Sequence, residues 1–148
     1  MAPVKFTEDA RAMLARAQEE ALGRGEDVIE AEHLPLALAD RPDVRDLGLD
    51  PDRLLEALEE EQQRSLAAAG VSAREFDRWG AAPRPRKAKL ATSGKLALHR
   101  AVKLAVARRE RRVSAHHLLA GVLAADYGRV PRALQLARVD IEDLRRHL

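Results

Sequence analysis

The 148-residue chain contains no cysteine and only four aromatic residues: two Phe, one Trp and one Tyr. The missing cysteines exclude disulfides and thiolate chemistry, and they are typical of a reducing compartment. No apolar stretch approaches the ~20 residues of a membrane-spanning helix, and the first residues lack the charged-then-apolar pattern of a signal peptide. Because 46% of the residues are hydrophobic, the chain can bury a core. We therefore expect a soluble cytoplasmic protein.

Segments that alternate polar and apolar residues with a period of two are also missing, so the sequence predicts an all-α fold. In the first half, apolar residues recur at helical spacing, glycines mark helix ends, and Thr7 and Asp50 suit helix N-caps. The predicted helices run from Thr7 to near Gly23, over about 32–39, over 42–49 as a short helix or turn, and from Pro51 to near Gly70.

The same order of elements returns in the second half, with predicted helices over 93–109, 114–126, 130–136 and 141–148, the last capped by Asp140. A shift of 84 residues aligns Leu14, Ala17, Ala21, Arg24, Glu26, Ala31, His33 and Leu34 with Leu98, Ala101, Ala105, Arg108, Glu110, Ala115, His117 and Leu118. Near the end the shift becomes 90. An internal duplication explains this pattern. We expect repeat 1 over about 5–70, a linker over about 71–91 and repeat 2 over about 92–148.

Charge is distributed unevenly along the chain. Residues 1–80 carry 10 Lys/Arg against 19 Asp/Glu, whereas residues 81–112 carry 11 against 1. The acidic run from Glu56 to Gln63 is expected to be the exposed side of its helix. The basic band over 84–112 is typical of a surface that attracts nucleic acid or an acidic partner, although it lacks aromatic residues for stacking bases.

The stretch "VIEAEHLPLAL" places Glu30, Glu32 and His33 before an apolar run. Helical zinc sites need ligands three or four residues apart, so the spacings of one and two predict no metal site. His33 and His117 occupy equivalent places, and we expect both to be buried and hydrogen-bonded between helices. Without cysteine or a glycine-flanked nucleophile, catalysis has no support. No phosphate loop is present either, so we expect a non-enzymatic protein without a cofactor.

The stretch "KFTEDARAMLARAQEEALGRGEDVIEAEHLPLALAD" resembles the amino-terminal (Clp-N) repeat of Clp/Hsp100 unfoldases, especially the ClpC type. The resemblance implies an eight-helix, pseudo-twofold domain that binds adaptors and substrates for an ATP-driven unfoldase. We expect a stand-alone Clp-N-like protein without ATPase modules, acting as an adaptor, a decoy or a guard in connection with a Clp protease.

The resemblance also implies a phosphoarginine pocket in each repeat. Repeat 1 keeps Thr7, Arg11 and Glu32 at the matching positions. The carboxylate would pair with the guanidinium, and the hydroxyl and cation at a helix start would hold the phosphate. Repeat 2 offers Ala91, Lys95 and His116 instead, which predicts a degenerate site. The threonine that precedes the glutamate in the family is Ala31 here and Ala115 in repeat 2.

The predicted function is therefore protein binding. Substrates, adaptors or a Clp ATPase are the expected partners, phosphoarginine-marked proteins among them. Two alternatives remain. The chain could be a nucleic-acid-associated regulator that binds through the basic band 84–112, or a structural protein that binds an unrelated helix.

Overall fold

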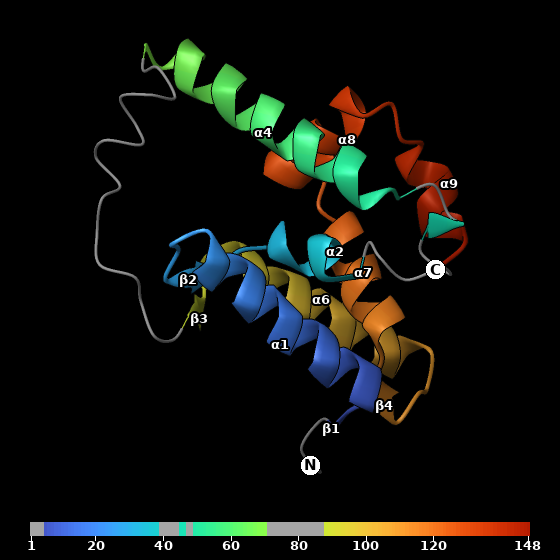
Figure 1. Ribbon diagram of the computed structural model, residues 1–148. Coiled ribbons are helices and arrows are strands. Elements are labelled where there is room, and N and C mark those ends of the chain that lie inside the picture. The colour runs from blue at the N-terminus through green and yellow to red at the C-terminus, as the bar shows by residue number, and fades with distance from the viewer. Residues whose placement is uncertain (1–4, 39–44, 47–48, 71–87) are drawn as a thin grey trace.

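The computed structural model of the protein describes residues 5–38, 45–46, 49–70 and 88–148 (Figure 1). The described helices are α1 (Glu8–Gly23), α2 (His33–Leu38), α4 (Pro51–Ala68), α6 (Thr92–Ala107), α7 (Ala115–Leu123), α8 (Arg129–Leu136) and α9 (Ile141–Arg146). The described strands have two residues each: β1 (Lys5–Phe6), β2 (Val28–Ile29), β3 (Lys89–Leu90) and β4 (Arg112–Val113). The predicted all-α fold class is confirmed.

Side-chain caps begin the helices at the positions that the sequence predicts. The Thr7 hydroxyl oxygen accepts a hydrogen bond from the Ala10 N–H at the start of α1. Asp50 accepts from the Asp52 N–H before α4, and Asp140 accepts from the Asp143 N–H before α9, both at 3.1 Å. These acceptors satisfy backbone donors that have no partner within the first turn of a helix.

Some predicted segments fall partly or wholly outside the described residues. The third helix or turn over 42–49 is one, and most of the linker, including the basic residues Arg84, Arg86 and Lys87, is another. At the end of the predicted linker, Lys89 and Leu90 form β3.

The four strands interlock the two repeats. β1 pairs in parallel with β4, and β2 pairs in parallel with β3. The 84-residue shift aligns β1 with β3 and β2 with β4. The first strand of each repeat therefore pairs with the second strand of the other repeat. The sequence did not predict these strands, because two residues are too short to show alternation. The two strand pairs connect the repeats through backbone hydrogen bonds.

Helix α7 lies at the centre of the domain. It contacts α1, α2 and α6 as well as α8 and α9, and seven of its nine residues are buried. Figure 1 shows α1 and α6 on one side of α2 and α7, with α4 crossing the other side next to α8. No helix in the described part of the chain is long and apolar enough to cross a membrane.

Small residues let the helices approach closely. Buried alanines line the inner faces of α1 and α6, at Ala17 and Ala21 and at their equivalents Ala101 and Ala105. At Gly121 in α7, an added Cβ would lie 2.3 Å from the Ala97 carbonyl oxygen of α6. Backbone atoms cannot move aside as a flexible side chain can, so this α6–α7 contact requires glycine.

We expect Gly121→Ala to lower the free energy of unfolding by about 1–3 kcal/mol, because the methyl group would force α6 and α7 apart. Gly23→Ala is the matched control, since a Cβ at Gly23 meets nothing within 4 Å. Denaturant unfolding of both variants measures the difference. Equal stability of the two variants would contradict the close contact.

Candidate functional site

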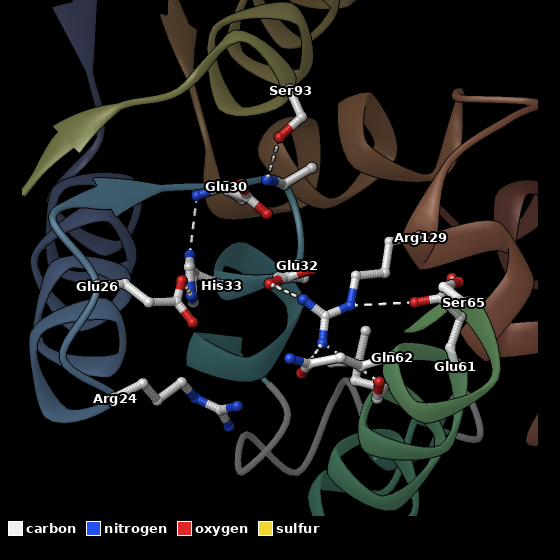
Figure 2. Close-up of polar contacts among 12 residues, drawn as sticks. Arg24, Glu26, Glu30, Glu32, His33, Glu61, Gln62, Ser65, Ser93 and Arg129 are labelled. Atoms are coloured by element: carbon white, nitrogen blue, oxygen red, sulfur yellow. Dashed lines mark hydrogen bonds and ion pairs between the residues drawn. The ribbon is translucent and has the colours of Figure 1, made fainter. Parts of the chain in front are cut away.

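Two backbone N–H groups in the turn before α2, those of Glu30 and Ala31, donate hydrogen bonds to side chains. The Ala31 N–H donates to Ser93 Oγ at the start of α6, at 3.0 Å. The Glu30 N–H donates to Nδ1 of His33 at 2.8 Å (Figure 2). The side chains of Glu30 and Glu32 therefore project from a rigid turn that joins repeat 1 to the first helix of repeat 2.

His33 and His117 are buried, as predicted, but their partners are not between helices. Nδ1 of His117 accepts from the Ser114 N–H at 2.9 Å, which repeats the His33 contact 84 residues later. Nε2 of His33 lies 2.9 Å from a Glu26 carboxylate oxygen, and Nε2 of His117 lies 3.2 Å from a Glu110 carboxylate oxygen. An accepting Nδ1 leaves the proton on Nε2, which faces the carboxylate. Each histidine thus braces the turn before its own helix.

Glu32 is 5% exposed and pairs with an arginine from the other repeat. Nη1 of Arg129, the first residue of α8, donates to Glu32 Oε1 at 2.7 Å. Nη2 of the same guanidinium donates to Gln62 Oε1 at 2.9 Å and to the Leu58 carbonyl oxygen at 3.3 Å. Figure 2 shows the Arg129 guanidinium lying between the turn before α2 and helix α4.

A second buried carboxylate, Glu61 of α4, completes this network. One of its oxygens lies 3.2 Å from Nε of Arg129, and the other accepts from Nε of Arg132 at 2.9 Å and from Ser65 Oγ at 2.7 Å. The expectation that the whole acidic run 56–63 is exposed is wrong at Glu61. Its neighbours Glu59 and Glu60 are exposed, whereas Glu61 faces α8.

The two carboxyl groups respond differently to burial. Burial raises the pKa of Glu32, and the nearby charge of Glu30 adds to the effect, so the pKa lies above its usual value although Arg129 opposes the shift. Burial also acts to raise the pKa of Glu61, but the hydrogen bonds from Ser65 and Arg132 and the charges of Arg132 and Arg129 outweigh it. The pKa of Glu61 is therefore lowered. The contrast follows from the stronger desolvation of Glu32 and from the hydrogen bonds that Glu61 accepts.

A pocket of about 440 Å³ opens beside Glu32. The turn Glu30–Glu32, the start of α6, the end of α7 and the start of α8 form its walls. Its polar lining includes Glu32, Thr92, Ser93, Arg100 and Arg129. Tyr127, which is 91% exposed, stands at the pocket's edge. The pocket therefore presents the carboxylates of Glu30 and Glu32, the hydroxyl groups of Thr92 and Ser93 and two guanidinium groups to one space.

The residues predicted for one pocket in repeat 1 do not lie together. Thr7 and Arg11 stand at the start of α1, whereas Glu32 follows β2 beyond the far end of that helix (Figure 1). Sixteen helical residues separate the two ends by about 24 Å.

The strand pairing instead groups these residues across the repeats. The Thr7 N–H donates to the Val113 carbonyl oxygen at 3.0 Å, which puts Thr7 beside the turn that leads to His116. Glu32 correspondingly lies beside the start of α6, where Lys95 is exposed. Arg100, one turn further along α6, lines the pocket.

Three potential metal ligands, on Glu26, Glu32 and His33, have donor atoms within 4.8 Å of one another. From the sequence, Glu30 was weighed together with Glu32 and His33 in place of Glu26, and no metal site was predicted. Each group already has a protein partner: the His33 ring faces Glu26, and Glu32 is held by Arg129. The guanidinium supplies the positive charge that the buried carboxylate requires.

Sequence reasoning missed Arg129 as the partner of Glu32 and treated Arg100 only as part of the basic band. Arg129 lies 97 residues from Glu32, and the 90-residue shift aligns it with Ala39, so the duplication gave no signal for a cation. Arg100 follows Ser93 by seven residues, two turns along the same helix face. That spacing could have placed Arg100 on the same face of α6 as Ser93.

The fold is similar to that of the N-terminal domains of the chaperones ClpD and Hsp104. Residues 5–75 match the family described as the Clp repeat (R) N-terminal domain. The resemblance to this repeat domain, inferred from the sequence, is confirmed. Comparison with curated protein sequences gives no significant match.

Three solved structures share the fold over nearly the whole chain. The N-terminal domain of the caseinolytic protease associated chaperone ClpD from Arabidopsis thaliana is 22% identical, with a TM-score of 0.71, and the match covers 97% of this chain and 94% of that one. The Hsp104 N-terminal domain from Candida albicans is 16% identical, with a TM-score of 0.63 and coverages of 97% and 88%. A chain from a malarial protein secretion system is 17% identical, with a TM-score of 0.69 and coverages of 96% and 90%.

The opposite pKa shifts of Glu32 and Glu61 predict opposite pH dependence. A raised pKa in the folded state gives stability that is full below the unfolded value of 4.5 and is lost as the pH rises through the folded pKa. A lowered pKa gives stability that is present above 4.5 and is lost as the pH falls through the folded pKa. The free energy of unfolding of the wild type, relative to that of Glu32→Gln, should therefore fall as the pH rises. Relative to that of Glu61→Gln, it should rise with the pH.

Denaturant unfolding of the three proteins between about pH 3 and pH 8 measures both differences. Slopes of the same sign for the two variants would contradict the assigned environments.

Proposed function

We propose that the chain is a non-enzymatic protein-binding module that recognises substrates or adaptors in connection with a Clp protease. The observation that carries the proposal is the pocket beside Glu32, in a domain whose fold resembles chaperone amino-terminal domains. Its lining matches a ligand that bears both a cation and an anion. Phosphoarginine is such a ligand, because its guanidinium and phosphate lie side by side in one group.

Within this pocket, Glu32 would bind the guanidinium of the ligand by a charge-assisted hydrogen bond. Arg129 already occupies that carboxylate at 2.7 Å, so the ligand would have to share Glu32 with it or displace it. Arg129 would keep its contacts to Gln62 and Glu61 on α4 in either case. To displace Arg129, a ligand must therefore bind the Glu32 carboxylate more favourably than Arg129 does.

The phosphate would lie against the start of α6. Thr92 and Ser93 bring hydroxyl groups there, Arg100 brings a guanidinium, and the free backbone N–H groups of the first turn favour an anion. Lys95, predicted from the sequence for the degenerate repeat 2 site with His116, is exposed on the same turn and would attract the phosphate from outside. The pocket would thus be shared between the repeats.

The corner at β1 and β4 is the weaker candidate. It holds Thr7 and Arg11, but His116 stands where the other corner has Glu32. The Thr7 hydroxyl also hydrogen-bonds to the carboxylate of Asp9, which would repel a phosphate. We therefore propose one working pocket per chain.

Titration with an arginine-phosphorylated peptide, and with the same peptide carrying unmodified arginine, tests the proposal. The phosphorylated peptide should bind more tightly, at one site per chain. Glu32→Ala should weaken its binding at least about tenfold, because a charge-assisted contact is lost. Glu30→Ala is the matched control, since Glu30 lines the same pocket, and it should change affinity by no more than about threefold.

Three outcomes would remove the pocket assignment: no binding, equal binding of both peptides, or equal effects of the two alanine variants.

The roles of adaptor, decoy and guard differ in which proteins the immobilised chain retains from a lysate. A Clp ATPase retained on the immobilised chain and lost with Glu32→Ala supports an adaptor, whereas retained phosphorylated client proteins support a decoy or guard.

A further inference from the structure

A second concave surface lies between α6 and α7. This groove has a volume of about 410 Å³ and is separate from the pocket beside Glu32, apart from Arg100 at the edge of both. Its apolar floor consists of Leu104, Ala120, Gly121 and Ala124. Its rim carries four cations: Arg100, Lys103, Arg108 and Arg145. We refer to this surface as the basic groove.

The cations of the basic groove are only partly neutralised. Arg145 pairs with Glu142 at 2.7 Å, and Arg108 donates to the Leu148 carbonyl oxygen at 2.8 Å. Within the described part of the chain, Arg100 and Lys103 make no ion pair with a carboxylate. Two or more positive charges therefore face solvent beside an apolar floor.

Repeat 1 has a groove that overlaps the equivalent place, although none of its lining residues comes from α2, the equivalent of α7. It lies against α1 and α4 and is lined by Glu19, Glu20, Gly23, Arg24, Leu55 and Glu59. The 84-residue shift aligns Lys103 with Glu19 and Leu104 with Glu20, and the 90-residue shift aligns Arg145 with Leu55. Glu19 thus reverses the charge of Lys103 and Leu55 removes that of Arg145, whereas Arg16 and Arg24 keep the cations of Arg100 and Arg108.

Since repeat 1 folds with Glu19 and Leu55 at these positions, the packing of the helices does not require the cations Lys103 and Arg145. Nor does the fold require the apolar floor to be open, because Glu20 stands where the basic groove has Leu104. These features are special to repeat 2, and together with Arg100 and Arg108 they fit a ligand that is acidic and partly apolar.

We propose that the basic groove binds an acidic peptide segment of a partner protein, with apolar side chains on the floor and carboxylates against the rim. An amphipathic helix rich in glutamate and leucine presents such side chains on one face. The rim charges steer it by attraction and the floor holds it by apolar burial. The floor carries alkyl groups and no aromatic ring for stacking bases, which favours a peptide over nucleic acid. The inference extends beyond the proposed function, because it does not use Glu32 or a phosphate.

The experiment uses the full chain and a synthetic amphipathic peptide of about 16 residues, built from glutamate and leucine at helical spacing. Ala124 is exposed at the end of α7, so a longer side chain there points along the floor without disturbing the core. Ala124→Glu should weaken peptide binding at least about fivefold, whereas Ala124→Lys should leave it equal or tighter. Lys103→Glu should also weaken it, and Arg111→Glu, with the same charge change on an exposed residue that does not line the groove, is its control.

Each outcome has a definite meaning. Opposite effects of the two Ala124 variants, with no binding of a lysine-for-glutamate peptide, support the proposal. Equal weakening by Ala124→Glu and Ala124→Lys overturns it, as does an unchanged affinity in Lys103→Glu. Tighter binding of duplex DNA than of the peptide, lost in Lys103→Glu, would assign the groove to nucleic acid instead. Self-association that Lys103→Glu abolishes would assign it to a second copy of the chain.

Discussion

A carboxylate that is withdrawn from water needs a positive partner, and Glu32 meets that need through Arg129. The two residues come from different repeats, so the ion pair draws the start of α8 onto the turn before α2. Contacts from the same guanidinium to Gln62, Leu58 and Glu61 then position α4. One wall of the pocket beside Glu32 exists because this arginine holds α8 in place.

The two repeats share their framework and differ in their surfaces. The exchanged strands, the alanine-lined helices and the buried histidine that faces a glutamate all recur after 84 residues. The positions around the pocket and the grooves have diverged: His116 stands in place of the buried Glu32, and Lys103 of the basic groove stands in place of Glu19. Packing constrains the framework residues in both copies, whereas each surface is free to acquire its own ligand.

Much of the fold could be predicted from the sequence because it depends on local signals. The caps Thr7, Asp50 and Asp140 and the helical spacing of apolar residues lie within a few positions of what they control. The exchanged strands could not be predicted, since each has only two residues. Of the candidate site, Glu32 and Lys95 were named from the sequence, but grouping Thr7 with Glu32 assumed that each repeat builds its own pocket. Parallel pairing between the repeats brings residues of different repeats together instead.

The dependence of the structure on the Glu32–Arg129 pair can be measured with a double-mutant cycle. The cycle compares the free energies of unfolding of the wild type, Glu32→Gln, Arg129→Gln and the double variant at neutral pH. A buried pair that joins the repeats predicts a favourable coupling of about 1 kcal/mol or more between the two substitutions. Additive effects within about 0.3 kcal/mol would contradict the account, because they would mean that the two side chains do not sense each other.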